Sequence, residues 1–159
     1  MTVKFICAAV IVISCSYVGI KLSNSLRVRV RMLSEILAAI GQIEISISTV
    51  RMPLTEIYSS LSTLKGATGE FFKRVEPGIS WKNQLDILTG LTAQDKALLT
   101  ELSEKLGSYE TERQLDELRR TQSLLTAALG QARTEMTENS KVYRSMSFFT
   151  GIVIAILLI

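Results

Sequence analysis

Apolar residues gather near both ends of this 159-residue chain. Residues 5–20 form a run of sixteen without a charge, and residues 147–159 form a run of thirteen. At about 1.5 Å per residue, helices of these lengths cover roughly 24 and 20 Å of a hydrocarbon core about 30 Å thick. Lysine and arginine stems beside each run can lie along apolar surface and lengthen the span. The pattern predicts transmembrane helices over residues 1–22 and 146–159.

Between these runs, a helical seam is the strongest signal. Its apolar residues recur at spacings of 3-4-3-4-3, which predicts one helix over about residues 25–49. Nothing between Lys21 and Leu33 breaks a helix, so this helix can continue out of the first apolar run. The seam consists of Leu33, Ile36, Ile40, Ile43, Ile47 and Val50.

Shorter elements follow the seam helix. Pro53 ends it and suits the first turn of the next helix, because proline has no backbone N–H to leave unpaired there. Residues 66–69 predict a turn and residues 70–76 a short helix. Ser80 then predicts the start of another helix, which carries Trp81.

Two further helices complete the domain. Thr92 and Asp95 predict an N-cap with an acidic partner at the third helical position, and Gly107 closes that helix. The last helix begins near Tyr109 and can run straight into the C-terminal apolar run. Its stripe is Leu115, Leu118, Leu125, Leu129, Ala132 and Met136. The expected fold is all-α, a bundle of about six helices over residues 23–145 between the two membrane helices.

Basic residues lie mainly on the inner sides of the apolar runs, and only Lys4 lies outside. The positive-inside rule therefore places residues 22–145 in the cytoplasm. The inner residues are Lys21, Arg27, Arg29, Arg31, Lys141 and Arg144.

Three alternatives remain open for the ends of the chain. Residues 12–15 fit the small-residue pattern before a lipidated cysteine, so Cys15 could anchor an external lipoprotein. A sensory protein with two membrane helices and an external helical domain has the same element order. Each apolar run could also be a buried helix of a soluble core.

Composition excludes several classes of chemistry. The chain has no histidine, so the usual general base, the commonest metal ligand and the usual partner of a nucleophilic serine or cysteine are all missing. Both cysteines, Cys7 and Cys15, lie in the first apolar run. A net charge of +3 is too small for a nucleic-acid surface. We expect a non-enzymatic protein with no cofactor, no metal, no catalytic residue, no small-molecule substrate and no nucleic-acid partner.

The distal domain is acidic. Residues 32–140 hold 11 basic and 15 acidic residues, and the excess is concentrated in residues 95–117, which we call the acidic hairpin. It is either a solvated face or a docking surface for a protein partner. The candidate partner-binding residues are Glu101, Glu104, Glu110, Glu112, Asp116 and Glu117.

Small residues share a face in each apolar run. Their helical spacing predicts that the two membrane helices pack closely, because small side chains allow backbones to approach in lipid. The predicted packing residues are Ala8, Cys15 and Gly19 in the first run and Ser147, Gly151 and Ala155 in the second.

Short motifs are distributed along nearly the whole chain. They comprise Glu44 and Ile47 leading to Pro53 and Leu54, then Leu106, Gly107, Glu110 and Gln114, and finally Lys141 and Tyr143 before the terminal run. In this order the chain resembles the stage III sporulation protein AB family of endospore-forming bacteria. It departs from the family pattern at Ser46, Thr49, Met52, Glu110 and Ser147.

The resemblance implies a component of the channel between mother cell and forespore, located in the mother-cell (outer forespore) membrane. Its implied partners are a secretion-type ATPase of the stage III sporulation protein AA kind, other membrane components of the channel, and membrane lipid. The helical domain would be similar to the cytoplasmic domains of type II secretion F and type IV pilus platform proteins.

Overall fold

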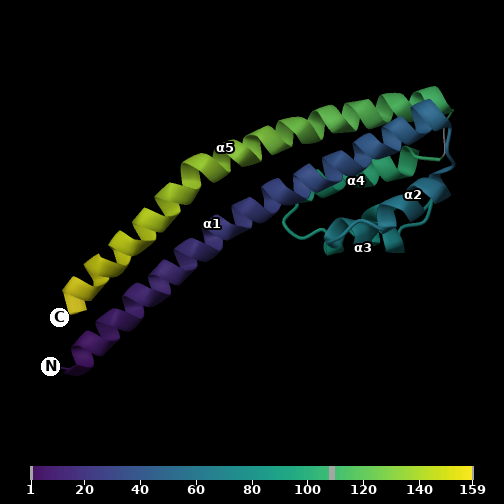
Figure 1. The fold of residues 1–159 in the computed structure, drawn as a ribbon. Coiled ribbons are helices and arrows are strands. Elements are labelled where there is room, and N and C mark those ends of the chain that lie inside the picture. Colours follow the sequence, from purple (N-terminus) through teal and green to yellow (C-terminus); the bar gives the residue numbers. More distant parts are fainter. Residues whose placement is uncertain (1, 108–109, 159) are drawn as a thin grey trace. The chain divides into compact units, whose positions relative to one another are not determined.

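The computed structural model describes the backbone of residues 2–107 and 110–158 (Figure 1). Side chains are described mainly from residue 23 to residue 138. Helix accounts for most of these residues and no strand occurs among them, which confirms the all-α prediction. The elements are α1 (Thr2–Ile45), the π-helix η1 (Ser46–Val50), α2 (Leu54–Ser62), α3 (Ala67–Arg74), the 3₁₀-helices η2 (Trp81–Asn83) and η3 (Leu85–Ile87), α4 (Ala93–Lys105) and α5 (Thr111–Leu158).

The chain divides into two units. Unit 1 comprises residues 1–28 and 132–159, and unit 2 comprises residues 29–131. Helices α1 and α5 each continue without a break from a terminal apolar run into unit 2, as the sequence allowed. The predicted domain boundaries at residues 22/23 and 145/146 stay a prediction.

Unit 1 consists of the outer parts of α1 and α5. Where its apolar side chains are described, several are exposed, including Tyr17, Phe149 and Val153. Among the described residues, one helical segment near the N-terminus, Ser23–Val50, is long and apolar enough to cross a membrane. Leu33, Ile36, Ile40, Ile43 and Ile47 of this segment are core residues of unit 2, however, while Ile45 is exposed. Most side chains of the predicted spans lie outside the described residues.

The core of unit 2 contains the seam predicted from the sequence. Leu33, Ile36, Ile40, Ile43 and Ile47 are all buried. So are leucines of α4 and α5, namely Leu99, Leu102, Leu118, Leu125 and Leu129. Burying such side chains removes apolar surface from water, which is the main favourable term in folding.

An aromatic cluster closes the core on the side of α2 and α3. The Trp81 ring lies 5.4 Å from Phe71, 6.0 Å from Phe72 and 6.2 Å from Tyr58, measured between centroids, and these rings meet edge to face. The Trp81 backbone N–H donates to Ser103 Oγ at 3.1 Å, which joins η2 to α4. Burial raises the pKa of Tyr58 well above its ordinary value, so the phenol is neutral.

The capping box of α4 forms as predicted. The Asp95 N–H donates to Thr92 Oγ1 at 3.2 Å, and the Thr92 N–H donates to Asp95 Oδ2 at 2.9 Å. Arg29 Nε also donates to Asp95 Oδ2, at 3.4 Å. Arg29, which the sequence predicted to flank the membrane, is therefore bonded to a carboxylate 66 residues away in the sequence.

Three local predictions were wrong. Val50 is 62% exposed, because the π turn of η1 departs from the 3.6-residue period on which the seam prediction rested. Residues 67–69 form the first turn of α3 instead of a turn between helices. The segment after Ser80 forms two 3₁₀-helices in place of one α-helix, and Ser80 makes no side-chain cap.

Candidate functional site

The end of unit 2 where α1 gives way to η1 has an unusual backbone. Arg51, which follows η1, adopts the left-handed conformation with φ 51° and ψ 37°. The N–H groups of Arg51 and Met52 both return to the carbonyl oxygen of Ser46, which ends the helix. A side chain in this region costs about 1 kcal/mol or more, whereas glycine adopts it freely. The backbone alone therefore does not account for an arginine here.

Two adjoining pockets lie beside Arg51, with volumes of about 220 and 360 Å³. They share Ile47, Arg51 and Thr111, so we treat them as one feature, the tip groove. Its lining combines apolar side chains with a polar rim. The lining residues are Ile47, Ser48, Arg51, Met52, Pro53, Leu54, Thr111, Glu112, Gln114 and Leu115.

Several motif residues that are far apart in sequence converge here. Ile47, Pro53, Leu54 and Gln114 line the groove. Gly107 has φ +84°, and a Cβ there would lie 3.4 Å from Leu54 Cδ1. Five motif residues thus lie in or beside the tip groove.

Glu44, another motif residue, joins α1 to α5 near this end. It accepts from Arg119 Nε at 2.9 Å and from Gln122 Nε2 at 3.0 Å. The motif residues Lys141 and Tyr143 lie outside the residues whose side chains are described.

The acidic hairpin is partly neutralised by bonds within the domain. Lys105 Nζ lies 2.8 Å from Glu101 Oε1 and 3.0 Å from Glu117 Oε1, and Arg120 lies within 4.0 Å of both carboxylates. Asp95, at the start of the hairpin, is 2% exposed and is a capping residue instead of a surface acid. Asp95 therefore adds little to the surface charge of the hairpin, and whether the hairpin is a solvated face or a docking surface stays a prediction.

This network shifts the pKa values of Glu101 and Lys105. The hydrogen bond from Lys105 lowers the pKa of Glu101 below its ordinary value. The hydrogen bonds to Glu101 and Glu117 raise the pKa of Lys105. The pair of Lys105 and Glu101 therefore stays charged over a wider pH range than the free side chains.

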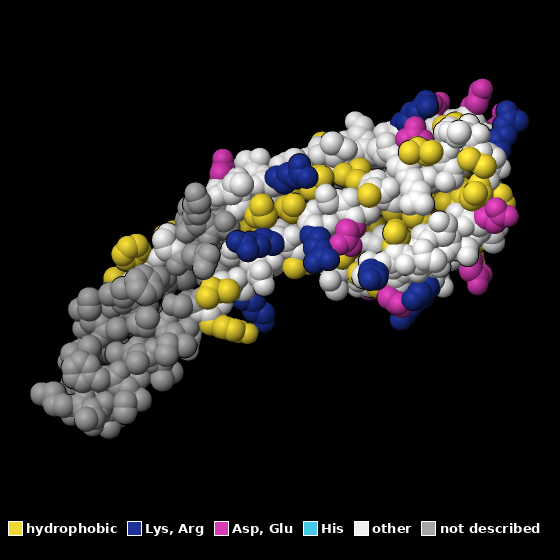
Figure 2. Space-filling model, viewed as in Figure 1, with side chains coloured by type: hydrophobic (Ala, Val, Ile, Leu, Met, Phe, Trp, Pro, Cys, Tyr) yellow, Lys and Arg dark blue, Asp and Glu magenta, His cyan; other side chains and the backbone are white. Residues whose placement is uncertain are grey.

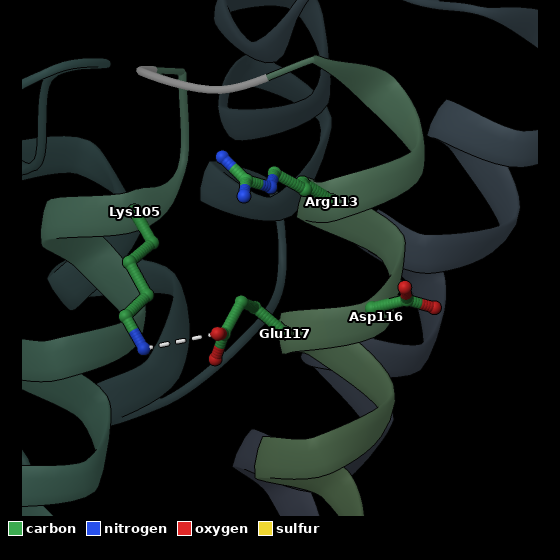
Figure 3. Close-up of a pocket in the computed structure, with 4 residues that line it drawn as sticks. All are labelled: Lys105, Arg113, Asp116 and Glu117. Carbon is green, nitrogen blue, oxygen red and sulfur yellow. Dashed lines mark ion pairs between the residues drawn. The ribbon is translucent and has the colours of Figure 1, made fainter.

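A pocket of about 430 Å³ lies beside this network, lined by Lys105, Arg113, Asp116 and Glu117. Figure 3 shows Lys105 and Glu117 facing each other, while Asp116 points away from them. Two basic and two acidic side chains line the pocket, so it offers no strong preference for an anion or a cation.

Other charges on the same part of unit 2 are not paired. Among the residues that the structure describes, Glu110, Glu112, Asp116 and Arg51 have no ion-pair partner, and all four are exposed. Glu104 is also exposed, on α4. Figure 2 shows hydrophobic side chains interspersed with charged ones where α1 gives way to η1. Of the four side chains without an ion-pair partner among the described residues, Arg51 and Glu112 line the tip groove.

Two of the predicted flank arginines also have carboxylate partners. Arg29 binds Asp95, and Arg31 Nε lies 2.9 Å from Glu35 Oε1. Glu35 in turn accepts from Thr68 Oγ1 at 3.1 Å, which joins α1 to α3. In the folded domain these two arginines are therefore not wholly available to lipid.

No group of side chains in the described part of the chain could hold a metal ion. Comparison with family models gives a match over residues 4–159 to the family described as Stage III sporulation protein AB. The chain belongs to the stage III sporulation protein AB family. Comparisons with curated proteins and with solved structures found no match.

Family membership makes this a sporulation-related protein. In this stage III sporulation protein AB chain, the predicted packing residues of the membrane helices lie outside the residues whose side chains are described. They are Ala8, Cys15, Gly19, Ser147, Gly151 and Ala155. The tip groove was not predicted, because the left-handed Arg51 has no sequence signature such as glycine or asparagine.

Proposed function

We propose that this chain is a non-enzymatic, membrane-anchored component of the sporulation channel, whose cytoplasmic helical domain is a platform for a secretion-type ATPase. The observation that carries the proposal is the continuity of α1 and α5. Each helix contains a terminal apolar run and also supplies core residues of unit 2, so the domain would be held at the membrane by both ends. The proposed location is the mother-cell (outer forespore) membrane.

Orientation is the first point to test. In full-length protein with Cys7 and Cys15 changed to serine, a Lys65→Cys variant carries its thiol on an exposed residue between α2 and α3. With the domain in the cytoplasm, a membrane-impermeant maleimide labels this thiol only after the cells are opened. Labelling in intact cells would contradict the proposed orientation and favour an external domain.

The ATPase would dock on the unpaired acids of the acidic hairpin. Glu101 and Glu117 already bind Lys105, so displacing those bonds would offset much of what a partner gains. Glu110 and Asp116 have no such bonds within the described residues and offer their full charge.

A paired set of charge reversals tests this surface. Glu110→Lys with Asp116→Lys should reduce pull-down of a stage III sporulation protein AA-type ATPase by about tenfold at low salt, because complementary charge guides docking. The control, Glu70→Lys with Glu76→Lys, makes the same change of net charge on exposed residues at and just after α3. Equal binding by both variants would discard this surface.

A further inference from the structure

The tip groove carries two opposite charges that do not satisfy each other. Arg51 and Glu112 line the same pocket of about 360 Å³, and neither has an ion-pair partner among the described residues. The apolar residues Ile47 and Leu115 line the same pocket. Val50, next to Arg51 in the chain, is exposed although it is a large apolar residue.

This combination is the pattern of a surface that complements itself. In a two-fold pair, residue i of one copy meets residue j of the other, and j meets i. A groove with one unpaired cation, one unpaired anion and an apolar floor can therefore pair both charges with a second copy. A partner of a single charge sign would leave either Arg51 or Glu112 facing a like charge.

We propose that the tip groove is an interface between two copies of this chain. Arg51 of each copy pairs with Glu112 of the partner subunit, and Val50 of each copy packs on the partner's apolar groove floor. This role accounts for an arginine at a left-handed position that glycine would occupy without strain. The proposal goes beyond ATPase docking and does not depend on it, since docking was assigned to Glu110 and Asp116.

Because membrane helices could also hold two copies together, the test needs a signal from the tip itself. In membranes containing the full-length chain without Cys7 and Cys15, a Ser48→Cys thiol at the groove is crosslinked with a short bismaleimide. We expect a crosslinked dimer. Arg51→Glu alone and Glu112→Arg alone should each reduce its yield at least fivefold, because each variant places like charges together twice.

The decisive sample mixes the two single variants. One copy then presents two glutamates and the other two arginines, so both ion pairs can form between unlike copies. Crosslinking between differently tagged Arg51→Glu and Glu112→Arg chains should return to within about twofold of the parent. A merely structural role of either residue would not produce this rescue, because each chain still carries its own substitution.

The matched controls are Lys65→Glu and Glu76→Arg, which change charge on exposed residues outside the groove and should leave the yield unchanged. Absence of the dimer in the parent, unchanged yield in both single variants, or failure of the mixture to recover would each overturn the proposal. Since Glu110 and Asp116 stay intact throughout, ATPase pull-down by the same variants reports separately on the proposed function.

Discussion

In the aromatic cluster, four rings meet at centroid distances of 5.1 to 6.2 Å, and the backbone N–H of Trp81 donates to Ser103 Oγ. In the tip groove, Arg51 and Glu112 have no ion-pair partner among the described residues, and Val50 stays exposed. Both regions belong to unit 2. The aromatic cluster buries its four side chains. The tip region leaves two charges without ion-pair partners in the described part of the chain, exposes Val50 and holds Arg51 in a strained backbone conformation. The contrast teaches that different residues of one domain hold the core together and stay available at the surface.

Placing a charge in the closed core should give the largest effect. Ile40→Asp should lower the free energy of unfolding by about 4 kcal/mol or prevent folding, because Ile40 is 1% exposed and a carboxylate there has no partner. Urea unfolding of the full-length chain in mild detergent, followed by the fluorescence of its single tryptophan, measures the change. Ala38→Asp, on an exposed position of the same helix, should cost less than about 1 kcal/mol. Equal costs would mean that the seam is not buried.

Removing the centre of the aromatic cluster should have the next largest effect. Trp81→Ala should cost about 3 to 4 kcal/mol, since it leaves a cavity between Phe71, Phe72 and Tyr58. Thermal unfolding followed by circular dichroism measures it. Lys82→Ala, at the exposed neighbouring residue, serves as the control. A cost near that of the control would show that the cluster does not close the core.

Breaking the capping box should have an intermediate effect on the free energy of unfolding. Asp95→Ala should cost about 2 kcal/mol, because it removes the acceptor for the Thr92 N–H and for Arg29. Asp95→Asn keeps an oxygen for the cap and loses only the charge, so its cost should be smaller. If both substitutions cost the same in chemical denaturation, the ion pair with Arg29 and not the cap carries the energy.

At the tip, stability should depend little on the side chain. Arg51→Gly should change the free energy of unfolding by less than about 1 kcal/mol, because relief of the left-handed strain offsets the greater freedom of glycine in the unfolded chain. Arg51→Val should be the less stable of the two, since a β-branched residue tolerates positive φ poorly. A large loss with glycine would make Arg51 a structural residue and remove the contrast with the core.

The smallest effect should come from the paired acids of the hairpin. Because the folded pKa of Glu101 is lowered, its pair with Lys105 adds stability above the ordinary pKa of 4.5, and this stability is lost as the pH falls through the folded value. Unfolding midpoints at pH 5 and pH 3 should therefore differ slightly less in Glu101→Gln than in the parent. No difference between the two proteins would mean that solvent screens the pair completely.

The sequence predicted the closed core better than the tip. The spacing of Leu33, Ile36 and Ile40 correctly predicted that they are buried, and Thr92 with Asp95 correctly predicted where α4 begins. Both predictions succeed because helix period and capping depend on neighbours within a few residues. Counting acids overestimated the acidic surface, since the count did not show that Lys105 binds both Glu101 and Glu117. The tip groove joins residues about 70 positions apart, Ile47 and Leu115, and no local pattern predicts such a meeting.

The five-residue π turn of η1 makes this end of the domain sensitive to chain length as well as to residue type. A single deletion within Ser46–Val50 would let α1 finish in ordinary α turns, and each residue beyond the deletion would rotate by about 100° around the helix axis. Arg51 would then leave its left-handed position, and a different side chain would reach the groove. Among relatives of this protein, a one-residue gap between Ile47 and Pro53 would thus mark a changed recognition surface on an unchanged scaffold.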